Sequence, residues 1–406
     1  MTSTRLDSVM RDAAPAEPRE CPCCGKGTLR VFHEVPNVPT NSCILLDSRE
    51  EALRWTRGDI RLGFCDHCGF IGNTAFEPAK TEYSARYEET QAFSPTFNAF
   101  HRSLAEDLVA RHALSNKRVL EIGCGKGEFL HLLCELGGNR GLGFDPGYSE
   151  ERGAELGCAE VEVLRDFFSE AYTHHRADLV CCKMTLEHIP EPQAFIELAT
   201  QVVERPDGVV FVQVPEARRI VEDCAFEDIY YEHCSYFTEA ALRGLFEGLG
   251  FTVTDTVTTY GGQYLTVEAR PFTETRRQPE PSGAHVEVLR DLIQSFEERV
   301  GARLRYWERL LDEWQRSLRK VVVWGSGSKA VAFLSAVPNP EVVQYAVDIN
   351  PYRQGYFIPG TGQQIVSPDR LAELDVDVVI VMNEMYLEEI RECLAELGLR
   401  PELHAL

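Results

Sequence analysis

The chain has 406 residues, and its 64 acidic residues outnumber its 41 basic ones, which gives a formal net charge of −23 at pH 7. This excess of negative charge argues against a nucleic-acid partner, because neutralising phosphates requires clustered lysine and arginine side chains. A hydrophobic fraction of 44% and a charged fraction of 26% are typical of globular proteins rather than of disordered chains. At about 150 residues per domain, the length predicts two or three domains.

The cysteine content is unusual for the compartment that the sequence predicts. Residues 1–19 form a polar tail without an apolar segment, so we expect no secretory signal. The sequence contains no run of about 18 consecutive apolar residues, so it predicts no membrane-spanning helix. We therefore expect a cytoplasmic protein without a membrane partner, whose fourteen cysteines stay reduced. Metal binding or simple burial must then explain them.

Four cysteines form two C-x-x-C pairs, each followed by glycine: Cys21 with Cys24, and Cys65 with Cys68. This spacing is typical of a tetrahedral Zn²⁺ site, because two thiolates on one tight turn can occupy adjacent corners. Four protein ligands leave no open position, so we expect a structural metal. The alternatives are that Cys23 or Cys43 replaces one ligand, that a pair is redox-active, or that the cysteines are simply buried.

Strands and helices alternate from residue 118 onwards. Apolar runs predict strands at 119–122, 141–144, 177–182 and 208–214, with helices at 128–136 and 193–203. This alternation predicts an α/β fold with a parallel sheet covered by helices. A Pro-, Arg- and Glu-rich linker at 271–282 precedes one long predicted helix over 285–318. A second, smaller α/β unit begins at Lys320, with strands at 321–324 and 376–381.

The first of these strands ends in a glycine loop that contains Glu121, Gly123, Gly125 and Gly127. Glycines let a ligand approach the backbone, and Asp145 at the end of the next strand is placed to accept hydrogen bonds from ribose hydroxyls. The loop looks like motif I of class I S-adenosylmethionine-dependent methyltransferases. The alternatives are a dinucleotide site, for which the third glycine is missing at the required spacing, and an ordinary turn.

Three further residues are candidates for the same cofactor site. Phe167 and Phe168 fall where that family places adenine contacts, although we expect at least one of them to be part of the core. Lys183 follows the third predicted strand, at the carboxyl end of the sheet, where open α/β folds bind ligands.

The segment from Tyr230 to Phe237 is dense in titratable and aromatic side chains. His233 beside Glu232 is suited to proton transfer, and the Tyr230 phenol can hold a substrate oxygen that gains charge. The alternative is a satisfied polar cluster at the start of a helix. Glu187 and His188 form a second Glu-His pair, which we expect to approach the same cleft.

The order of these motifs, with Tyr83-x-x-x-Tyr87 and the C-terminal run 348–361, resembles the three-domain sugar C-methyltransferases that act on nucleotide-linked 4-keto deoxysugars. The resemblance covers about residues 20–400. After a flexible tail at 1–19, it implies four parts: a zinc-binding domain over 20–75, a class I methyltransferase domain over 76–280, a linking helix over 283–319 and a Rossmann-like domain over 320–406.

The resemblance also implies a mechanism with S-adenosylmethionine as cofactor. A base removes the proton beside the keto group, and the resulting enolate carbon attacks the methyl group. The family's base maps onto His233, with Tyr230 and Glu232 in support. His188 matches a histidine near the substrate ketone, and Tyr83 or Tyr87 matches a tyrosine near the cofactor and substrate; we take Tyr83 as the catalytic candidate and Tyr87 as the cofactor-binding one.

The chain departs from the family pattern in segments that we expect to face the substrate. Tyr231 replaces the first histidine of Tyr-His-Glu-His, Gln263 replaces the serine of Gly-Gly-Ser, and the glycine loop and the segment 90–95 also differ. The acceptor class therefore stays open. The alternatives are a methyltransferase of the same architecture acting on a non-sugar acceptor in secondary metabolism, by O-, N- or C-methylation, and a non-enzymatic binding protein.

The C-terminal unit opens with a second glycine-rich turn at 324–330, which lacks the spacing of a phosphate-binding P-loop. We expect this unit to shape the substrate cleft. Lys329 and Arg353 are candidates to contact a nucleotide diphosphate. The sequence does not indicate the oligomeric state.

Overall fold

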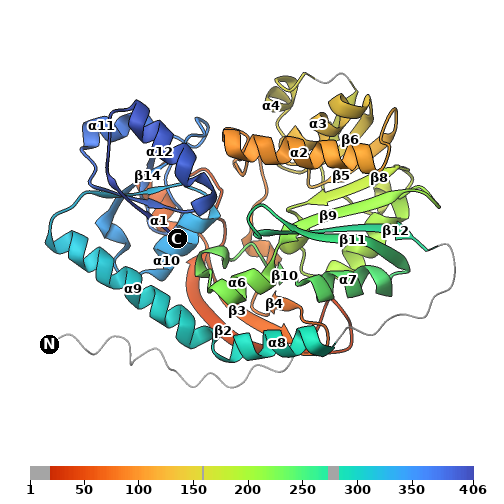
Figure 1. The fold of residues 1–406 in the computed structure, drawn as a ribbon, viewed down its shortest axis with the longest axis horizontal. Helices are drawn as coiled ribbons and strands as arrows, with labels where there is room; N and C mark the ends of the chain where they lie inside the picture. Colours follow the sequence, from red (N-terminus) through yellow and green to blue (C-terminus); the bar gives the residue numbers. More distant parts are fainter. Residues whose placement is uncertain (1–18, 158–159, 273–282) are drawn as a thin grey trace.

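The computed structural model describes residues 19–157, 160–272 and 283–406. Most of the predicted tail and residues 273–282 of the predicted linker lie outside this part of the chain. Three β-sheets with helices packed around them make up the described residues (Figure 1). Among the helices of these residues, none has both the length and the apolar composition that crossing a lipid bilayer requires.

The first sheet is antiparallel and has the strand order β1-β2-β3-β4-β10. Its strands are β1 (Arg19–Glu20), β2 (Thr28–Pro39), β3 (Arg57–Cys65), β4 (Ile71–Asn73) and β10 (Ser235–Tyr236). The short helix α1 (Arg49–Arg54) lies between β2 and β3. Because β10 belongs to the Tyr230–Phe237 motif, this sheet joins two segments that are far apart in the sequence.

The second sheet has seven strands in the order β11-β12-β9-β8-β5-β6-β7. Its strands are β5 (Arg118–Ile122), β6 (Arg140–Phe144), β7 (Val161–Leu164), β8 (Leu179–Lys183), β9 (Val209–Pro215), β11 (Phe251–Thr259) and β12 (Tyr264–Pro271). Five strands are parallel, and β12 lies antiparallel between β9 and β11. The four predicted strands begin and end within about two residues of β5, β6, β8 and β9.

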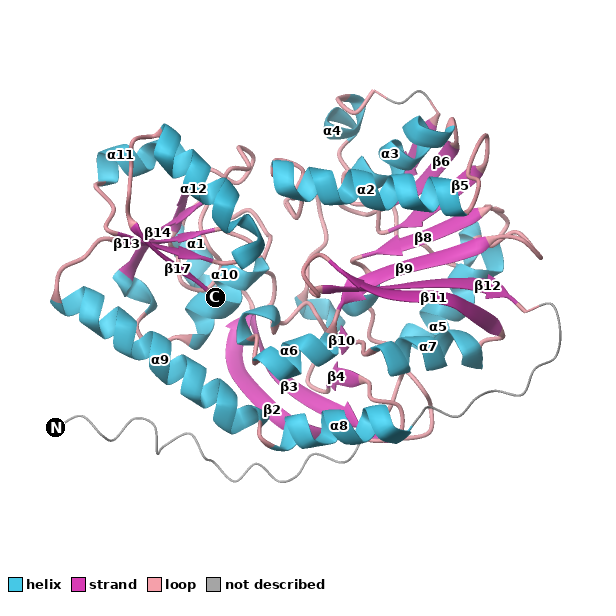
Figure 2. Ribbon diagram, viewed as in Figure 1, coloured by secondary structure: helices cyan, strands magenta, loops and turns pink. Residues whose placement is uncertain are grey.

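Helices cover both faces of this second sheet (Figure 2). They are α2 (Pro95–Arg111), α3 (Glu128–Gly137), α5 (Pro192–Ala199) and α7 (Glu239–Gly248), whereas α6 (Ala217–Asp223) packs with the first sheet and α4 (Glu150–Ala154) follows β6. Because α2 and α3 lie on one face and α5 and α7 on the other, the central strands are buried along nearly their whole length. The expected α/β fold with a class I methyltransferase-like sheet is confirmed.

The single helix predicted over 285–318 is interrupted at Ser295. Helix α8 (Gly283–Gln294) ends there, and helix α9 (Phe296–Arg316) begins one residue later. The Ser295 hydroxyl donates to the carbonyl of Leu292, which offers the backbone an alternative to the helical hydrogen bond. The buried Phe296 ring packs edge-on against Phe32 and His33 of β2, which anchors the start of α9 on the first sheet.

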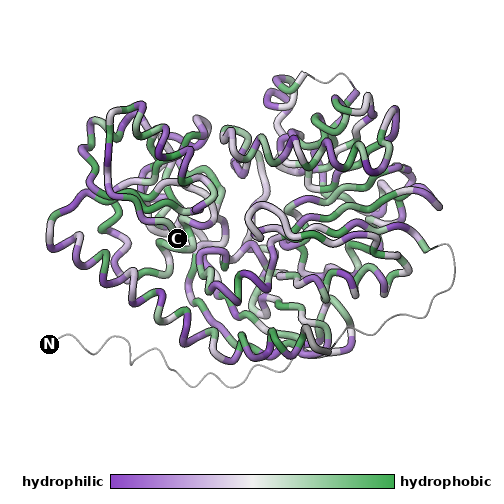
Figure 3. The backbone as a smooth tube through the Cα atoms, in the orientation of Figure 1, coloured by the Kyte–Doolittle hydropathy of each residue, from purple (hydrophilic) through white to green (hydrophobic). Residues whose placement is uncertain are grey.

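The third sheet is parallel, with the order β15-β14-β13-β16-β17. Its strands are β13 (Val321–Trp324), β14 (Val343–Val347), β15 (Gln364–Val366), β16 (Val378–Val381) and β17 (Glu402–Ala405), and its helices are α10 (Ser328–Ala336), α11 (Leu371–Leu374) and α12 (Leu387–Glu396). Strand β13 has the predicted bounds, whereas β16 starts at Val378 rather than at residue 376. In Figure 3 the apolar residues concentrate on the strands, and the polar ones on the outer helix faces.

The buried Arg353 joins this third unit to the segment that follows Tyr87. Its Nε donates to Ser326 Oγ at 2.7 Å, and its Nη1 donates to the backbone oxygen of Glu88 at 2.6 Å. Its Nε also lies 3.7 Å from Asp348 Oδ2. Arg353 is thus committed to structural contacts, which corrects the expectation that it contacts a diphosphate.

Replacing Arg353 by leucine should lower the free energy of unfolding by about 3–5 kcal/mol, because the buried carbonyls of Glu88 and Ser326 would lose their donor and the partly buried Asp348 would lose its nearby cation. Arg370→Leu is the control. It removes an exposed ion pair with Glu373 and should cost at most about 0.5 kcal/mol. Denaturant unfolding followed by tryptophan fluorescence measures both values, and equal losses in the two variants would contradict the anchoring role.

Candidate functional site

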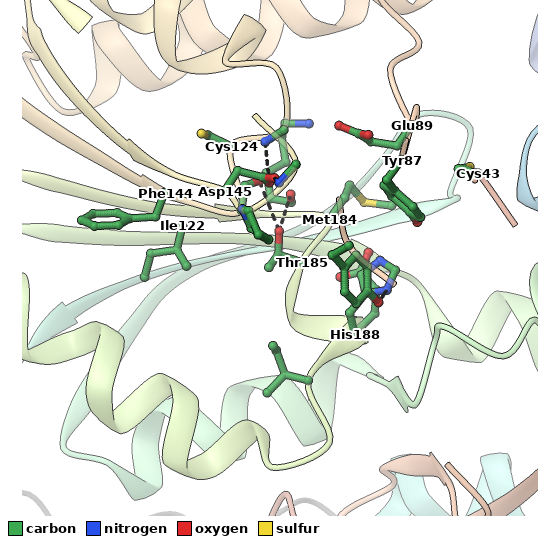
Figure 4. Close-up of a pocket in the computed structure, with 18 of the residues that line it drawn as sticks. Cys43, Tyr87, Glu89, Ile122, Cys124, Phe144, Asp145, Met184, Thr185 and His188 are labelled. Atoms are coloured by element: carbon green, nitrogen blue, oxygen red, sulfur yellow. Dashed lines mark hydrogen bonds between the residues drawn. The ribbon is translucent and has the colours of Figure 1, made fainter. Parts of the chain in front are cut away.

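A cavity of about 730 Å³ lies at the carboxyl ends of β5, β6 and β8. Figure 4 shows Asp145, Thr185 and Cys124 on one side of it, and His188 with Tyr87 on the other. Most of the predicted site residues line it: Tyr83, Tyr87, Glu121, Gly123, Gly125, Asp145, Phe167, Phe168, Lys183, His188, Tyr230 and His233. Gly127 and Glu232 do not. One cavity therefore brings together the glycine loop and both Glu-His motifs.

The glycine loop is shaped by close contacts on both sides. Gly123 has a φ of 71°, and a Cβ atom there would lie 2.0 Å from the Thr185 hydroxyl oxygen, so only glycine fits. The backbone N–H of Gly125 donates to Asp145 Oδ2 at 2.9 Å, and that of Gly147 donates to Oδ1 at 2.7 Å. These bonds hold the carboxylate at the end of β6 with lone pairs left for a ligand.

The two phenylalanines differ in their environments. Phe168 packs edge-on against Phe144, with ring centroids 5.1 Å apart, whereas Phe167 is 62% exposed at the cavity rim. The expectation that one of them belongs to the core therefore fits Phe168, and Phe167 is free to stack on a planar ligand. Lys183 Nζ lies 5.5 Å from the ring centroid of Phe129. Burial raises the pKa of Glu121 to about 7, an effect that Lys183 opposes.

Two tyrosine–histidine pairs occupy the other side of the cavity. Tyr83 Oη lies 3.0 Å from His188 Nδ1, and Tyr230 Oη lies 2.8 Å from His233 Nε2. The two imidazole rings are 4.9 Å apart at an angle of 81°. Burial lowers the pKa of His188 to about 4 and that of His233 well below its usual value, so both rings are neutral near pH 7.

Pairing of β10 with β4 positions His233. Asn73 N donates to the carbonyl of Cys234 at 2.9 Å, and Cys234 N donates to the carbonyl of Glu187 at 3.0 Å. The residue directly after His233 is therefore fixed to both the first sheet and the 3₁₀ turn Leu186–His188. Sequence distance alone gives no indication of this arrangement.

Glu232, expected to support His233, does not line the cavity. Its carboxylate accepts hydrogen bonds from Ser42 N at 2.8 Å, from Asn41 Nδ2 at 3.2 Å, and from the Ser42 hydroxyl. It therefore anchors the segment after β2 behind the Tyr230–Phe237 motif. Any effect of Glu232 on the reaction must pass through the position of its neighbour His233.

The Tyr231 and Gln263 side chains do not line the cavity either. The prediction that these positions face the substrate is therefore wrong. Tyr231 is 1% exposed, packs over Gly58 and accepts a hydrogen bond from Glu77 N at 2.9 Å. Gln263 forms a reciprocal amide pair with Asn383 of the third unit, with bonds of 2.9 and 3.0 Å. Both residues that depart from the family pattern are packing or clamping residues.

The cavity lining is strongly acidic. Lys329 forms an ion pair with Asp228 at 2.6 Å and does not reach the cavity, so neither predicted diphosphate ligand is free. Lys183 is the one lysine or arginine on the lining within the described residues. Seven carboxyl side chains surround it: Glu82, Glu89, Glu121, Glu128, Asp145, Asp166 and Glu187.

Two lining or supporting residues have no distinctive sequence signal. Glu89 lies against the glycine loop, since a Cβ atom on Gly125 would lie 2.6 Å from its Oε1. Lys126 Nζ donates to the backbone oxygens of Tyr87 at 2.8 Å and Gly147 at 3.1 Å. Lys126 therefore holds the Tyr87 segment on the loop. The only indication of this role in the sequence is that the loop departs from the family pattern at this position.

The four paired cysteines converge at the edge of the first sheet, with all Sγ atoms within 4.8 Å of one another. The Sγ separations are 3.7 Å for Cys21 with Cys68 and 3.8 Å for Cys24 with Cys65. A tetrahedral ion with Zn–S bonds of about 2.3 Å requires separations of about 3.8 Å, so the group is compatible with zinc. Cys23, which donates to Ala241 O, and Cys43, which lines the cavity, are outside this group.

Two family models match the chain. A model described as a methyltransferase domain matches residues 97–256, and one described as a C-methyltransferase C-terminal domain matches residues 285–399. The C-methyltransferase NovU of Streptomyces niveus is 28% identical over 309 residues, which cover 71% of this chain and 72% of that protein. The ubiquinone biosynthesis O-methyltransferase of Escherichia coli O157:H7 is 32% identical over 125 residues, which cover 28% of this chain and 51% of that protein.

Solved structures resemble parts of the chain more distantly. The magnesium protoporphyrin IX methyltransferase of Synechocystis, solved with bound SAH, has a TM-score of 0.36 and 20% identity, and covers 44% of this chain and 84% of its own. A SAM-dependent methyltransferase from Aquifex aeolicus has a TM-score of 0.35 and 20% identity, and covers 48% and 100%. Such low TM-scores support no inference about function. From the family models and the NovU relative, the chain is an S-adenosylmethionine-dependent methyltransferase, and these matches support a place among the C-methyltransferases.

Proposed function

We propose that the protein methylates a carbon atom beside a ketone, with His233 as the base that forms the enolate. One observation carries this proposal: Tyr83, His188, Tyr230 and His233 line the same cavity as Asp145 and the glycine loop. A methyl donor held by the loop and an acceptor held by the histidines would therefore meet in one enclosed space.

The loop side of the cavity fits S-adenosylmethionine. Asp145 offers carboxylate oxygens to ribose hydroxyls, the backbone at Gly123 and Gly125 permits close approach, and Phe167 is exposed for an adenine ring. The acidic lining suits the positive charges of the sulfonium and ammonium groups. When bound, the cofactor supplies an electrophilic methyl group.

The tyrosine–histidine side provides proton transfer and oxyanion stabilisation. His233 is neutral, so its Nε2 can accept the proton beside the ketone once the acceptor displaces the Tyr230 hydroxyl. Burial keeps Tyr83 and Tyr230 protonated by raising the pKa of both phenols. The two hydroxyls can then donate to the enolate oxygen as it gains charge.

The acceptor has two candidates. The resemblance of the motifs to sugar C-methyltransferases favours a nucleotide-linked 4-keto deoxysugar. The cavity lining, with seven carboxyl groups and a single lysine, favours an acceptor without phosphates, methylated at carbon, oxygen or nitrogen. We further propose the division into domains over 20–75, 76–280 and 320–406, with residues 283–319 as the connection, and a structural Zn²⁺ on the four cysteines.

His233→Asn should lower the rate of methyl transfer by about 10²–10⁴-fold, the usual contribution of a general base, without weakening cofactor binding. The assay combines labelled S-adenosylmethionine with nucleotide 4-keto sugars and the matching unphosphorylated ketones, and NMR locates the label. His404→Asn, at a hydrogen bond with Glu402 in β17 outside the cavity lining, is the control. Full activity of His233→Asn would refute base catalysis, and transfer only to unphosphorylated ketones would refute the nucleotide sugar.

Asp145→Ala should weaken S-adenosylmethionine binding by about 1–3 kcal/mol, or roughly 5- to 150-fold in dissociation constant, because hydrogen bonds to a charged group are lost. Isothermal titration calorimetry measures the constant. Asp369→Ala, outside the cavity, should bind the cofactor as the wild type does. An unchanged constant in Asp145→Ala would contradict the ribose contact.

Purified protein should contain about one zinc ion per chain by elemental analysis, and Cys65→Ser should lose it because one tetrahedral ligand is removed. Since β3 and β4 lead to the β4–β10 pairing, methyl transfer should fall in the same variant. Cys393→Ser, which lies in α12, should retain both metal and activity. Wild-type protein that is active without bound metal would refute the structural site.

A further inference from the structure

Glu187 is a buried carboxyl group on the cavity wall next to His233. It is 1% exposed and belongs to the 3₁₀ turn after β8. No other described residue supplies a hydrogen bond to either of its carboxyl oxygens, and the contact that they have is with the backbone N–H of Glu187 itself. Its Oε1 lies 3.9 Å from His233 Nε2, the atom that takes the substrate proton in the proposed reaction.

The surroundings of Glu187 favour its neutral form at rest. Burial raises its pKa to about 8, and Lys183 is the one cation that opposes this rise. The other titratable groups that face it are neutral: the phenols of Tyr83, Tyr230 and Tyr264, the imidazoles of His188 and His233, and the thiols of Cys182 and Cys234. An ionised Glu187 is therefore easily reprotonated by any acid that forms beside it.

An imidazolium at His233 would be such an acid. Burial, the neighbouring His188 and Lys329 all disfavour a positive charge on this ring. The imidazolium that forms when His233 takes a proton from the acceptor is therefore poorly stabilised by its surroundings. The carboxyl oxygen at 3.9 Å can accept it after a small movement, which converts a charged pair into two neutral groups.

We propose that Glu187 is the positioning residue that receives the substrate proton from His233. This inference rests on the proposed function. Starting from the ionised carboxylate of Glu187, the C–H bond of the acceptor breaks, its electron pair stays as the enolate, and the proton passes through His233 Nε2 to Glu187 Oε1. The enolate pair then forms the new C–C bond to the methyl group, the C–S bond breaks towards sulfur, and Glu187 releases the proton to water after the product leaves.

A metal ion is the competing explanation for this group, because ligand atoms of Glu187, His188 and His233 lie within 4.8 Å of one another. His188 argues against it. Its Nδ1 is hydrogen-bonded to Tyr83, and its ring also bonds to the backbone of Glu232. A metal would have to displace one of these contacts.

The test compares Glu187→Gln with Glu227→Gln, another buried glutamate with an unpartnered oxygen, which lies outside the cavity lining. The first readout needs no acceptor: infrared difference spectra across pH should contain a carboxylic-acid component that disappears near pH 8. This component should be missing in Glu187→Gln and present in Glu227→Gln. If the Glu187→Gln protein still has this component, the proposal is overturned. Zinc that binds to the Cys65→Ser protein but not to the Cys65→Ser/Glu187→Gln double variant would also overturn it, because Glu187 would then be a metal ligand.

The second readout is deuterium exchange beside the ketone in the acceptor panel. The wild-type rate should rise with pH through about 8, because only ionised Glu187 accepts the proton. Glu187→Gln should exchange at least tenfold more slowly, lose this pH dependence, and keep the cofactor dissociation constant. Exchange with an unchanged pH profile in Glu187→Gln overturns the proton-acceptor role alone. If the wild type shows the infrared component but exchanges no ketone, the proposed function fails and the relay fails with it.

Discussion

The arrangement of the site depends on one strand pairing, that of β10 with β4. The first sheet, which carries the four paired cysteines, takes its last strand from the segment that contains His233. The hydrogen bonds of Cys234 to Asn73 and Glu187 then fix the base between this sheet and the wall of the second sheet. An element remote from the cofactor loop therefore determines where the base lies, and metal at its edge would stabilise the pairing indirectly.

The two sides of the cavity differ in the kind of titratable side chain that lines them. The carboxyl groups near the loop suit a cationic donor, whereas burial keeps the phenols and imidazoles on the other side neutral. Seven carboxyl groups line the cavity without clustered cations, but burial raises the pKa of Glu89 and Glu121 to about 7 and that of Glu187 to about 8, so the lining carries less negative charge than this number of groups. Arg353 bonds to the backbone of Glu88 and lies beside Asp348, and Lys329 pairs with Asp228. Neither cation is therefore free to bind a phosphate group of the acceptor.

The third unit contributes Ser328 to the cavity lining and contacts residues of the first two units beside the cavity. Arg353 and Asn350 hold Glu88, and Glu389 of α12 accepts a hydrogen bond from Ser94. The Gln263–Asn383 amide pair fixes the β11–β12 hairpin to the same unit. These bonds hold the segment after Tyr87, and the unit offers no free cation to the cavity within the described residues.

The buried parallel strands, the glycine loop with Asp145 and the cysteine pairs can be predicted from the amino-acid sequence. Each depends on the periodicity or spacing of residues that are near one another in the chain. The direction of each side chain in the Tyr230–Phe237 motif, in contrast, is visible only in the folded protein. Glu232 and Tyr231 turn into packing while Tyr230 and His233 face the cavity, because residues 230–233 form a turn, closed by the hydrogen bond from His233 N to the carbonyl of Tyr230, that puts its first and last side chains on the same side. The solitary carboxyl of Glu187 is likewise a tertiary fact, since burial and the lack of a partner arise only when distant segments meet.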